Sequence, residues 1–177
     1  MILKKKKERA DSLLSQEYLC RAMELLLLER EYSGITVTDI CKKAGVSRIT
    51  FYKYFASKES LTQAMTVQKL EAAWCIAEEK PGGNGILEIL KALTPFSAGI
   101  RNLIRNGQTI LLYGCFRDFF KSVSKEGSVS PALAGYAGGF FLVTTEWLLG
   151  GAKGSAAEMA SLLEKGFPCP IPEGLSL

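Results

Sequence analysis

Thr36 and Ser47 can each begin a helix, and Gly45 stands two residues before Ser47. Asp39 follows Thr36 by three residues, which is where a capping box places an acid. Ser47 is a preferred residue at the position before the first helical turn, and the helix that it begins should run to about Phe55. Two short helices joined by a turn that contains glycine form the helix-turn-helix pattern. The segment after Ser47 would then be its second helix.

The second helix of this pattern carries more aromatic and basic residues than so short a segment can bury. Phe51 and Phe55 are four residues apart and should face the core. Tyrosine hydroxyls and lysines suit phosphates, and arginine suits the paired acceptors of guanine, which favours a helix that reads the major groove of DNA. The alternative for Tyr52 and Tyr54 is half-buried packing. The residues left for the outer and flanking faces are Arg48, Thr50, Tyr52, Lys53 and Tyr54.

Apolar residues recur at three- and four-residue spacings along most of the chain, which predicts a succession of helices. A first helix should start near Asp11 or Ser15 and stop near Tyr32-Ser33-Gly34, because Gly34 offers the left-handed conformation that often follows a helix. A long helix capped by Ser57 should end before the breaker Pro81–Gly85. Further helices are expected at residues 86–93, 96–105, 108–123, 131–152 and 155–164. The predicted fold is all-α.

The positive charge of the chain is concentrated at one end. Residues 1–60 hold 12 Lys and Arg against 8 Asp and Glu, whereas residues 61–177 hold 10 of each kind. The whole net charge of +4 therefore belongs to the N-terminal third. Such asymmetry indicates a module that binds a polyanion joined to a neutral module. We predict a helix-turn-helix DNA-binding domain at residues 1–60 and a second helical domain at residues 61–177.

Several classes of chemistry have no residues to support them. The chain has no histidine, and its five cysteines form no C-x-x-C pair, so zinc sites and Ser-His-Asp or Cys-His catalysis are not expected. The phosphate-binding motif G-x-x-x-x-G-K-[ST] and the nucleophile motif G-x-S-x-G are also absent. We predict no enzymatic activity, no metal and no cofactor, with cysteines that stay reduced.

The N-terminus and the apolar runs bear on localisation. Lys4 to Lys7 follow the first three residues directly, and the apolar runs Leu25–Leu28 and Phe140–Val143 are short. A signal peptide needs an apolar stretch of about 7 to 15 residues, and a spanning helix needs about 20. We therefore expect neither export nor a transmembrane segment, and a cytoplasmic protein.

The helix-turn-helix segment as a whole, ITVTDICKKAGVSRITFYKYFASKESL, runs from Ile35 to Leu61. It resembles the DNA-binding signature of the TetR-type transcriptional regulators, and it matches nearly every fixed position of that pattern. The upstream stretch AMELLLLE, from Ala22 to Glu29, is similar to the first helix of the family. Two departures concern packing there: Leu26 replaces the usual phenylalanine, and Glu31 stands near the usual glycine.

The resemblance implies roles for individual residues. Thr38, Thr50, Tyr52 and Lys53 match positions that touch phosphates or bases, and Arg48 and Ile49 match variable positions that read base edges. Tyr54 matches a position that meets the DNA backbone, and Lys58 matches a lysine that holds a phosphate at the start of the fourth helix. The alternative for Lys58 is a solvated turn lysine. A single recognition helix reads few base pairs, so we expect a homodimer on double-stranded DNA with an inverted-repeat operator.

The C-terminal glycines suggest where a dimer would form. Gly135, Gly138 and Gly139 each cost about 0.5 to 1 kcal/mol inside a helix, and close helix approach could compensate. The last two predicted helices resemble those that pair across a two-fold axis in TetR-type proteins. An intramolecular hairpin is the alternative. The residues expected at the dimer interface are Gly135, Gly139, Leu142 and Leu162.

An effector pocket is the remaining expectation for the C-terminal part. Aromatic residues there could line an apolar cavity, as in the ligand domains of the family, or they could be plain core. The expected function is a repressor that an unknown small-molecule effector releases from DNA; the alternative is control by a protein partner without such a pocket. The candidate effector-binding residues are Trp74, Phe96, Tyr113, Phe116, Phe120 and Trp147.

Overall fold

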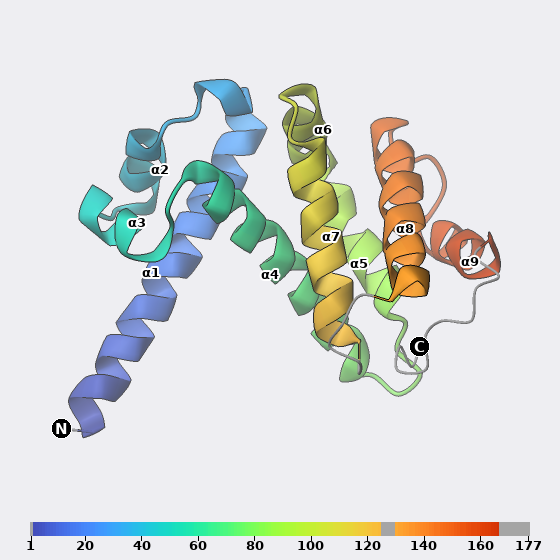
Figure 1. Ribbon diagram of the computed structural model, residues 1–177, viewed down its shortest axis with the longest axis horizontal. Coiled ribbons are helices and arrows are strands. Elements are labelled where there is room, and N and C mark those ends of the chain that lie inside the picture. Colours follow the sequence, from blue (N-terminus) through green and yellow to red (C-terminus); the bar gives the residue numbers. More distant parts are fainter. Residues whose placement is uncertain (1, 125–129, 167–177) are drawn as a thin grey trace. The chain divides into compact units, whose positions relative to one another are not determined.

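The computed structural model describes residues 2–124 and 130–166, with side chains from Leu13 onward, and every regular element in these ranges is a helix (Figure 1). No strand occurs in this part of the chain, so the predicted all-α class is confirmed. The chain divides into two compact units, Met1–Met65 and Thr66–Leu177. Helix α4 (Lys58–Glu78) starts in the first unit and ends in the second.

The N-terminal unit is built on α1 (Ile2–Glu29), against which α2 (Val37–Ala44) and α3 (Arg48–Tyr54) pack. Helix α1 contributes apolar residues three and four positions apart, and each of these faces the same core. The fully buried side chains of the unit come from all four of its helices and from the segment before α2. The largest of them are Leu19, Met23, Leu26, Ile35, Ile40, Phe51 and Leu61.

The predicted caps around the turn are present. Thr36 Oγ1 accepts a hydrogen bond from the Asp39 backbone N–H at 3.2 Å, and the Asp39 carboxylate accepts one from the Thr36 N–H at 3.0 Å. Hydrogen bonds from the Thr36 side chain and backbone, with Arg30 nearby, hold the pKa of Asp39 below its usual value. Gly45 ends α2 in the left-handed conformation with φ 69°, which costs glycine little. Ser47 Oγ then accepts from the Thr50 N–H at 3.0 Å and begins α3.

Two sequence-based expectations about the first helix are wrong. Helix α1 begins at Ile2 instead of near Asp11 or Ser15, because lysine-rich sequence continues a helix without adding to an apolar face. Gly34 does not take the left-handed conformation: it closes a 3₁₀ turn, η1 (Tyr32–Gly34), in which the Ile35 N–H donates to the Tyr32 carbonyl at 3.1 Å. Burial of the Tyr32 side chain holds this turn against the unit.

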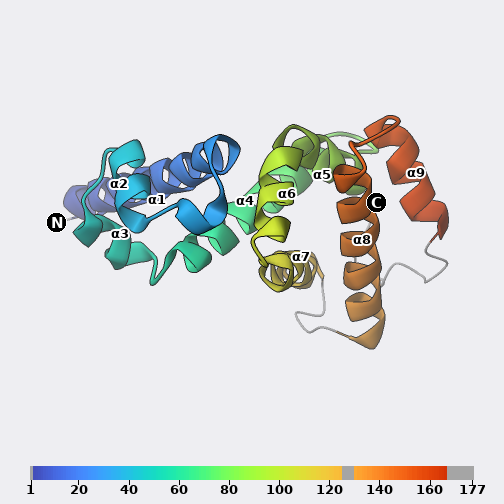
Figure 2. The ribbon, with the colours of Figure 1, turned by 90° about the horizontal axis from the view of Figure 1, so that it is seen from above.

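The C-terminal unit contains α5 (Gly85–Leu93), the 3₁₀ turn η2 (Thr94–Phe96), α6 (Ser97–Arg105), α7 (Thr109–Val123), α8 (Pro131–Leu149) and α9 (Ala156–Gly166). Helix α8 packs along α7 and against α6, whereas α9 packs on α5 (Figure 2). Ser130 caps α8 through the Leu133 N–H, and Pro131 lies in the first turn of the helix.

Helix α8 is long and apolar enough to cross a membrane by length and composition alone, although its longest uninterrupted apolar run is short. Within the unit it buries Leu133, Ala137, Phe140 and Thr144 against its neighbours. A core helix of a globular unit passes the same length and composition test. Its packing on α6 and α7 favours that interpretation.

The cysteines that the structure describes are all free. Cys20, Cys41 and Cys115 are buried, and Cys75 is exposed on α4. Burial raises the pKa of Cys115 to about 12, which keeps its thiol protonated and unreactive. Cys169 lies outside the described residues.

Candidate nucleic-acid interface and C-terminal cavity

Helix α3 has one buried side that fixes its orientation. Phe51 has no solvent exposure, and Phe55, just after the helix, is also buried, with the two ring centroids 6.0 Å apart. The rings of Tyr52 and Phe51 pack edge to face with their centroids 5.3 Å apart, and Tyr52 remains half exposed. Since Phe51 holds one side of the helix in the core, the residues around it are presented outward.

The outward side of α3 carries basic, aromatic and aliphatic groups together. Arg48, Ile49, Tyr52 and Lys53 are exposed, whereas Thr50 and Tyr54 are half-buried. The Arg48 guanidinium lies 6.0 Å from the Tyr52 ring centroid, and the Lys53 ammonium lies 5.2 Å from that of Tyr54. Contacts of this kind restrict a long cationic side chain while leaving its N–H groups available for hydrogen bonds.

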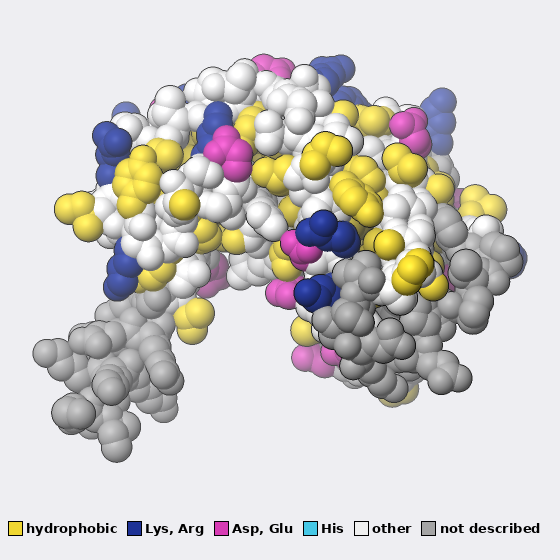
Figure 3. Space-filling view, viewed as in Figure 1, with side chains coloured by type: hydrophobic (Ala, Val, Ile, Leu, Met, Phe, Trp, Pro, Cys, Tyr) yellow, Lys and Arg dark blue, Asp and Glu magenta, His cyan; other side chains and the backbone are white. Residues whose placement is uncertain are grey.

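The charge of this surface has one sign. From Ile40 to Lys58 the sequence contains no acidic residue. Hydrophobic and basic side chains stand next to each other on the surface over α3 (Figure 3). Such a surface attracts a polyanion and offers it both charge and apolar contact. The basic residues of the segment are Lys42, Lys43, Arg48, Lys53 and Lys58.

Two exposed residues of α2, which packs against α3, are further candidates for contact with a nucleic acid. Thr38, a predicted contact, is exposed in the first turn, and Lys42 is exposed in the last turn. Lys42 was not among the predicted contacts, although the acid-free run around it was a signal in the sequence. Lys43 beside it is paired with Glu29 of α1. The outward residues of α3 and these two residues of α2 make up the candidate nucleic-acid interface.

Lys58 has partners inside the N-terminal unit. Its ammonium donates to the carbonyl oxygens of Tyr32 at 2.9 Å and Ile35 at 3.1 Å, and it lies 4.3 Å from the Tyr32 ring centroid. The Tyr32 hydroxyl in turn donates to Glu59 at 3.1 Å. Burial raises the pKa of Tyr32 to about 12, so this hydroxyl keeps its proton at neutral pH. Two of the three N–H donors of Lys58 thus hold η1 to the start of α4.

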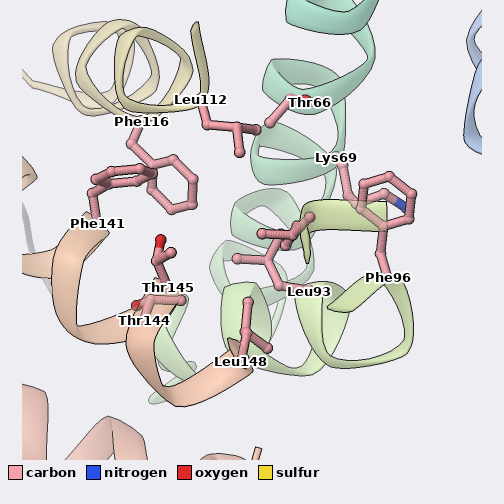
Figure 4. Close-up of a pocket in the computed structure, with 11 residues that line it drawn as sticks. Thr66, Lys69, Leu93, Phe96, Leu112, Phe116, Phe141, Thr144, Thr145 and Leu148 are labelled. Atoms are coloured by element: carbon pink, nitrogen blue, oxygen red, sulfur yellow. The ribbon is translucent and has the colours of Figure 1, made fainter. Parts of the chain in front are cut away.

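In the C-terminal unit, residues of α4 to α8 surround a small cavity (Figure 4). The space open to the centre of a water-sized sphere is about 10 Å³, which is close to the room that one water needs. Thr144 Oγ1 is buried beside it and has no hydrogen-bond partner among the described residues. The lining residues are Thr66, Lys69, Leu93, Phe96, Ile100, Leu112, Phe116, Phe141, Thr144, Thr145 and Leu148.

Only some of the predicted effector residues meet at this cavity. Phe96 and Phe116 line it, and the Lys69 ammonium lies 5.3 Å from the Phe96 ring centroid. Trp147 lines a separate, open depression. Trp74, Tyr113 and Phe120 pack against other aromatic rings, at centroid distances of 5.8, 5.8 and 5.1 Å from Phe119, Phe141 and Phe119 respectively. The polar lining residues Thr66, Lys69, Thr144 and Thr145 were not predicted, because helical periodicity marks apolar faces and does not identify a polar side chain beside a cavity.

The predicted dimer residues lie toward the surface of the unit. Leu142 of α8 is 60% exposed and Leu162 of α9 is 62% exposed. Gly135 is exposed and Gly139 half-buried, and the spacing of these two residues from Leu142 places all three on one face of α8. Gly138 instead faces inward, where an added Cβ would lie 3.9 Å from the Tyr113 ring.

A short capped helix, a left-handed glycine and a second helix with outward basic and aromatic residues define the helix-turn-helix class of domain. Residues 21–65 match the family model of the bacterial regulatory proteins, tetR family. The match lies in the helix-turn-helix segment and the helices on either side of it, and it confirms the family resemblance predicted from the sequence.

Curated relatives share the same part of the chain. The chain is 42% identical over 43 residues to the uncharacterized HTH-type transcriptional regulator YxbF of Bacillus subtilis, which is 24% of this chain and 11% of that protein. It is 37% identical over 59 residues to the HTH-type transcriptional regulator AlkX of Mycobacterium tuberculosis, 33% of this chain and 28% of that one. The chain thus spans less than a third of the length of each of these two relatives.

Solved structures extend the likeness to most of the chain. The dihydroxyacetone kinase operon activator DhaS superimposes with a TM-score of 0.56 over 88% of this chain and 97% of its own, at 16% identity. A structural-genomics protein from Rhodococcus sp. RHA1, assigned as a transcriptional regulator, does so with a TM-score of 0.53 over 92% of this chain and 100% of its own, also at 16% identity. At this identity the likeness shows a shared fold.

Proposed function

We propose that this chain is a sequence-specific, dimeric DNA-binding transcriptional regulator that acts in the cytoplasm and has no enzymatic activity. The observation that carries the proposal is the outward surface of α3, where Arg48, Ile49, Tyr52 and Lys53 are exposed beside one another in a segment without acidic residues. In this proposal residues 1–60 bind DNA, and residues 61–177 form the dimer and receive the effector. Release of DNA by an effector would make the protein a repressor.

The proposed contacts divide into two kinds. Arg48 and Ile49, at the start of α3, would read base edges in the major groove. Hydroxyl and ammonium groups around them would contact phosphates, which position the helix without reading sequence. The residues proposed for these phosphate contacts are Thr38, Thr50, Tyr52, Lys53, Tyr54 and Lys58.

Two copies of the chain are needed in this proposal. The exposure of Leu142 and Leu162 supports an interface between copies, since these large aliphatic side chains otherwise meet water. Gly135 is exposed on the same face of α8 as Leu142 and would allow a second helix to approach closely. A two-fold dimer presents its recognition helices to two half-sites about one helical turn apart, or a multiple of it. Analytical sedimentation of the complex with the operator measures how much protein is bound to each duplex. A bound mass of 19.3 kDa, which is that of one chain, would contradict the dimer.

Arg48→Ala tests the reading of bases. In selection from random duplexes, the wild-type protein should enrich an inverted repeat and bind it with an affinity that falls steeply as salt rises. Arg48→Ala should lose about 1 to 3 kcal/mol of binding free energy for each half-site of that repeat, because each subunit loses a bidentate contact to guanine. It should also relax the preference at one base pair of each half-site. Fluorescence anisotropy on the repeat and on a scrambled duplex measures both effects.

The scrambled duplex is also the control for charge. Arg48→Ala should weaken binding to the scrambled sequence much less than to the repeat. Equal affinity of the wild-type protein for the two duplexes would remove the claim of sequence-specific regulation and leave a non-specific DNA-binding protein.

A second candidate assigns the C-terminal unit to a protein partner instead of a small molecule. The observation in its favour is the small size of the cavity. The space open to the centre of a water-sized sphere is about 10 Å³, which leaves room for about one water. A screen of apolar and anionic metabolites by thermal unfolding separates the two candidates. On the effector proposal some ligand raises the melting temperature and lowers affinity for the operator, and Thr144→Val weakens its effect. No shift with any ligand favours the protein partner.

A further inference from the structure

Ile49 is the most exposed of the large hydrophobic side chains that the structure describes, at 85%. It is the second residue of α3, and the buried side of that helix is made by Phe51. The Ile49 side chain therefore adds nothing to the core of the N-terminal unit. Isoleucine is also a weaker helix former than lysine, glutamate or glutamine, so helix propensity does not account for it either.

The surroundings of Ile49 limit what could cover it. Arg48 precedes it, and Tyr52, whose ring lies 6.0 Å from the Arg48 guanidinium, stands one helical turn further on. No acidic residue occurs between Ile40 and Lys58. A partner of this surface must therefore be anionic as a whole and yet present a small apolar group at the position of Ile49.

Thymine in a DNA duplex meets both conditions. Its C5-methyl group is the apolar feature of the major groove, and it lies among acceptor atoms and between two phosphate backbones. We infer that Ile49 selects thymine by contact with this methyl group, beside the guanine that Arg48 reads. The inference rests on the proposed function and adds a base to the operator: each half-site contains a thymine within about two base pairs of the guanine, because neighbouring residues at a helix start reach neighbouring base pairs.

Deoxyuridine tests this inference directly, because uracil differs from thymine only by the absent methyl group. In the selected inverted repeat, each thymine of a half-site is replaced by uracil in turn, and the dissociation constant is measured by anisotropy. One position should weaken wild-type binding about fourfold, the ratio that corresponds to one buried methyl, and about sixteenfold when both half-sites carry the change. The other thymines should show little change.

Ile49→Ala completes a double-mutant cycle. This variant should bind the thymine and uracil duplexes equally at the sensitive position, because alanine does not reach the methyl group. Arg48→Ala is the matched control: it lacks the neighbouring side chain and should keep the uracil effect. Thermal unfolding of Ile49→Ala should match the wild-type protein, because so exposed a side chain contributes little to the core.

The experiments distinguish a failure of the inference about Ile49 from a failure of the proposed function. If uracil changes nothing at any position, or if Ile49→Ala keeps the full uracil effect, the inference about Ile49 is overturned while sequence-specific binding stands. If selection enriches no repeat and scrambled duplexes bind equally well, the proposed function itself fails, and the inference fails with it.

Discussion

Phe51→Ala is expected to lower the free energy of unfolding of the N-terminal unit by about 3 to 5 kcal/mol. Phe51 is fully buried, and its ring contacts those of Tyr52 and Phe55 at centroid distances of 5.3 and 6.0 Å. Removing it leaves a cavity beneath α3, a helix of only 7 residues that has little stability of its own. Denaturant unfolding followed by circular dichroism measures the loss, and operator binding should disappear at the temperature where the unit unfolds.

Ile49→Ala is the matched control for this prediction, since it removes an aliphatic side chain from the same helix. Because Ile49 is 85% exposed, the substitution Ile49→Ala should change the free energy of unfolding by less than about 0.5 kcal/mol. If Phe51→Ala destabilised the protein no more than Ile49→Ala does, the buried side of α3 would be assigned incorrectly.

Lys58→Met is expected to lower the free energy of unfolding by about 2 kcal/mol, because hydrogen bonds from a charged donor to the carbonyls of Tyr32 and Ile35 are lost. Methionine keeps most of the aliphatic length, so the change isolates the ammonium group. The same denaturant experiment measures the effect. An unchanged free energy of unfolding would mean that Lys58 does not hold η1 and is available as a plain phosphate contact.

Lys53→Met separates the two roles of lysine in this unit. Lys53 is exposed on α3 and its ammonium faces the Tyr54 ring, so its removal should leave stability nearly unchanged. It should weaken binding to all duplexes alike and lower the slope of log affinity against log salt by about 1 for each bound subunit. Lys58→Met should instead act first on folding, even though the family resemblance assigns both residues to DNA contact.

Helix α3 has two sides with different roles. The buried side of α3 is aromatic and carries the stability of the helix, and the outward side is basic and carries the proposed recognition. Because Phe51 and Tyr52 are neighbours and their rings touch, the side chain that fixes the helix also supports one that would meet DNA. A change in the core beneath α3 should therefore alter DNA affinity even when the outward residues are intact.

Local features of this protein were determined by the sequence alone. The capping box of Thr36 and Asp39, the Ser47 cap and the glycine between them depend on hydrogen bonds that reach three residues and on one backbone conformation. The buried position of Phe51 and Phe55 followed from helical periodicity, since residues four apart share a face. All-α architecture and the family assignment of residues 21–65 depend on patterns of the same short range.

Other features were decided only by the tertiary structure. The partners of Lys58 lie 26 and 23 residues away in sequence, and a side chain that reaches so far leaves no periodic signal. The cavity is lined by residues from Thr66 to Leu148, and its polar members Thr144 and Lys69 line the same space only because α8 belongs to the same unit as the end of α4. Spacing along one helix fixes which residues share a face, whereas packing between helices fixes what that face touches.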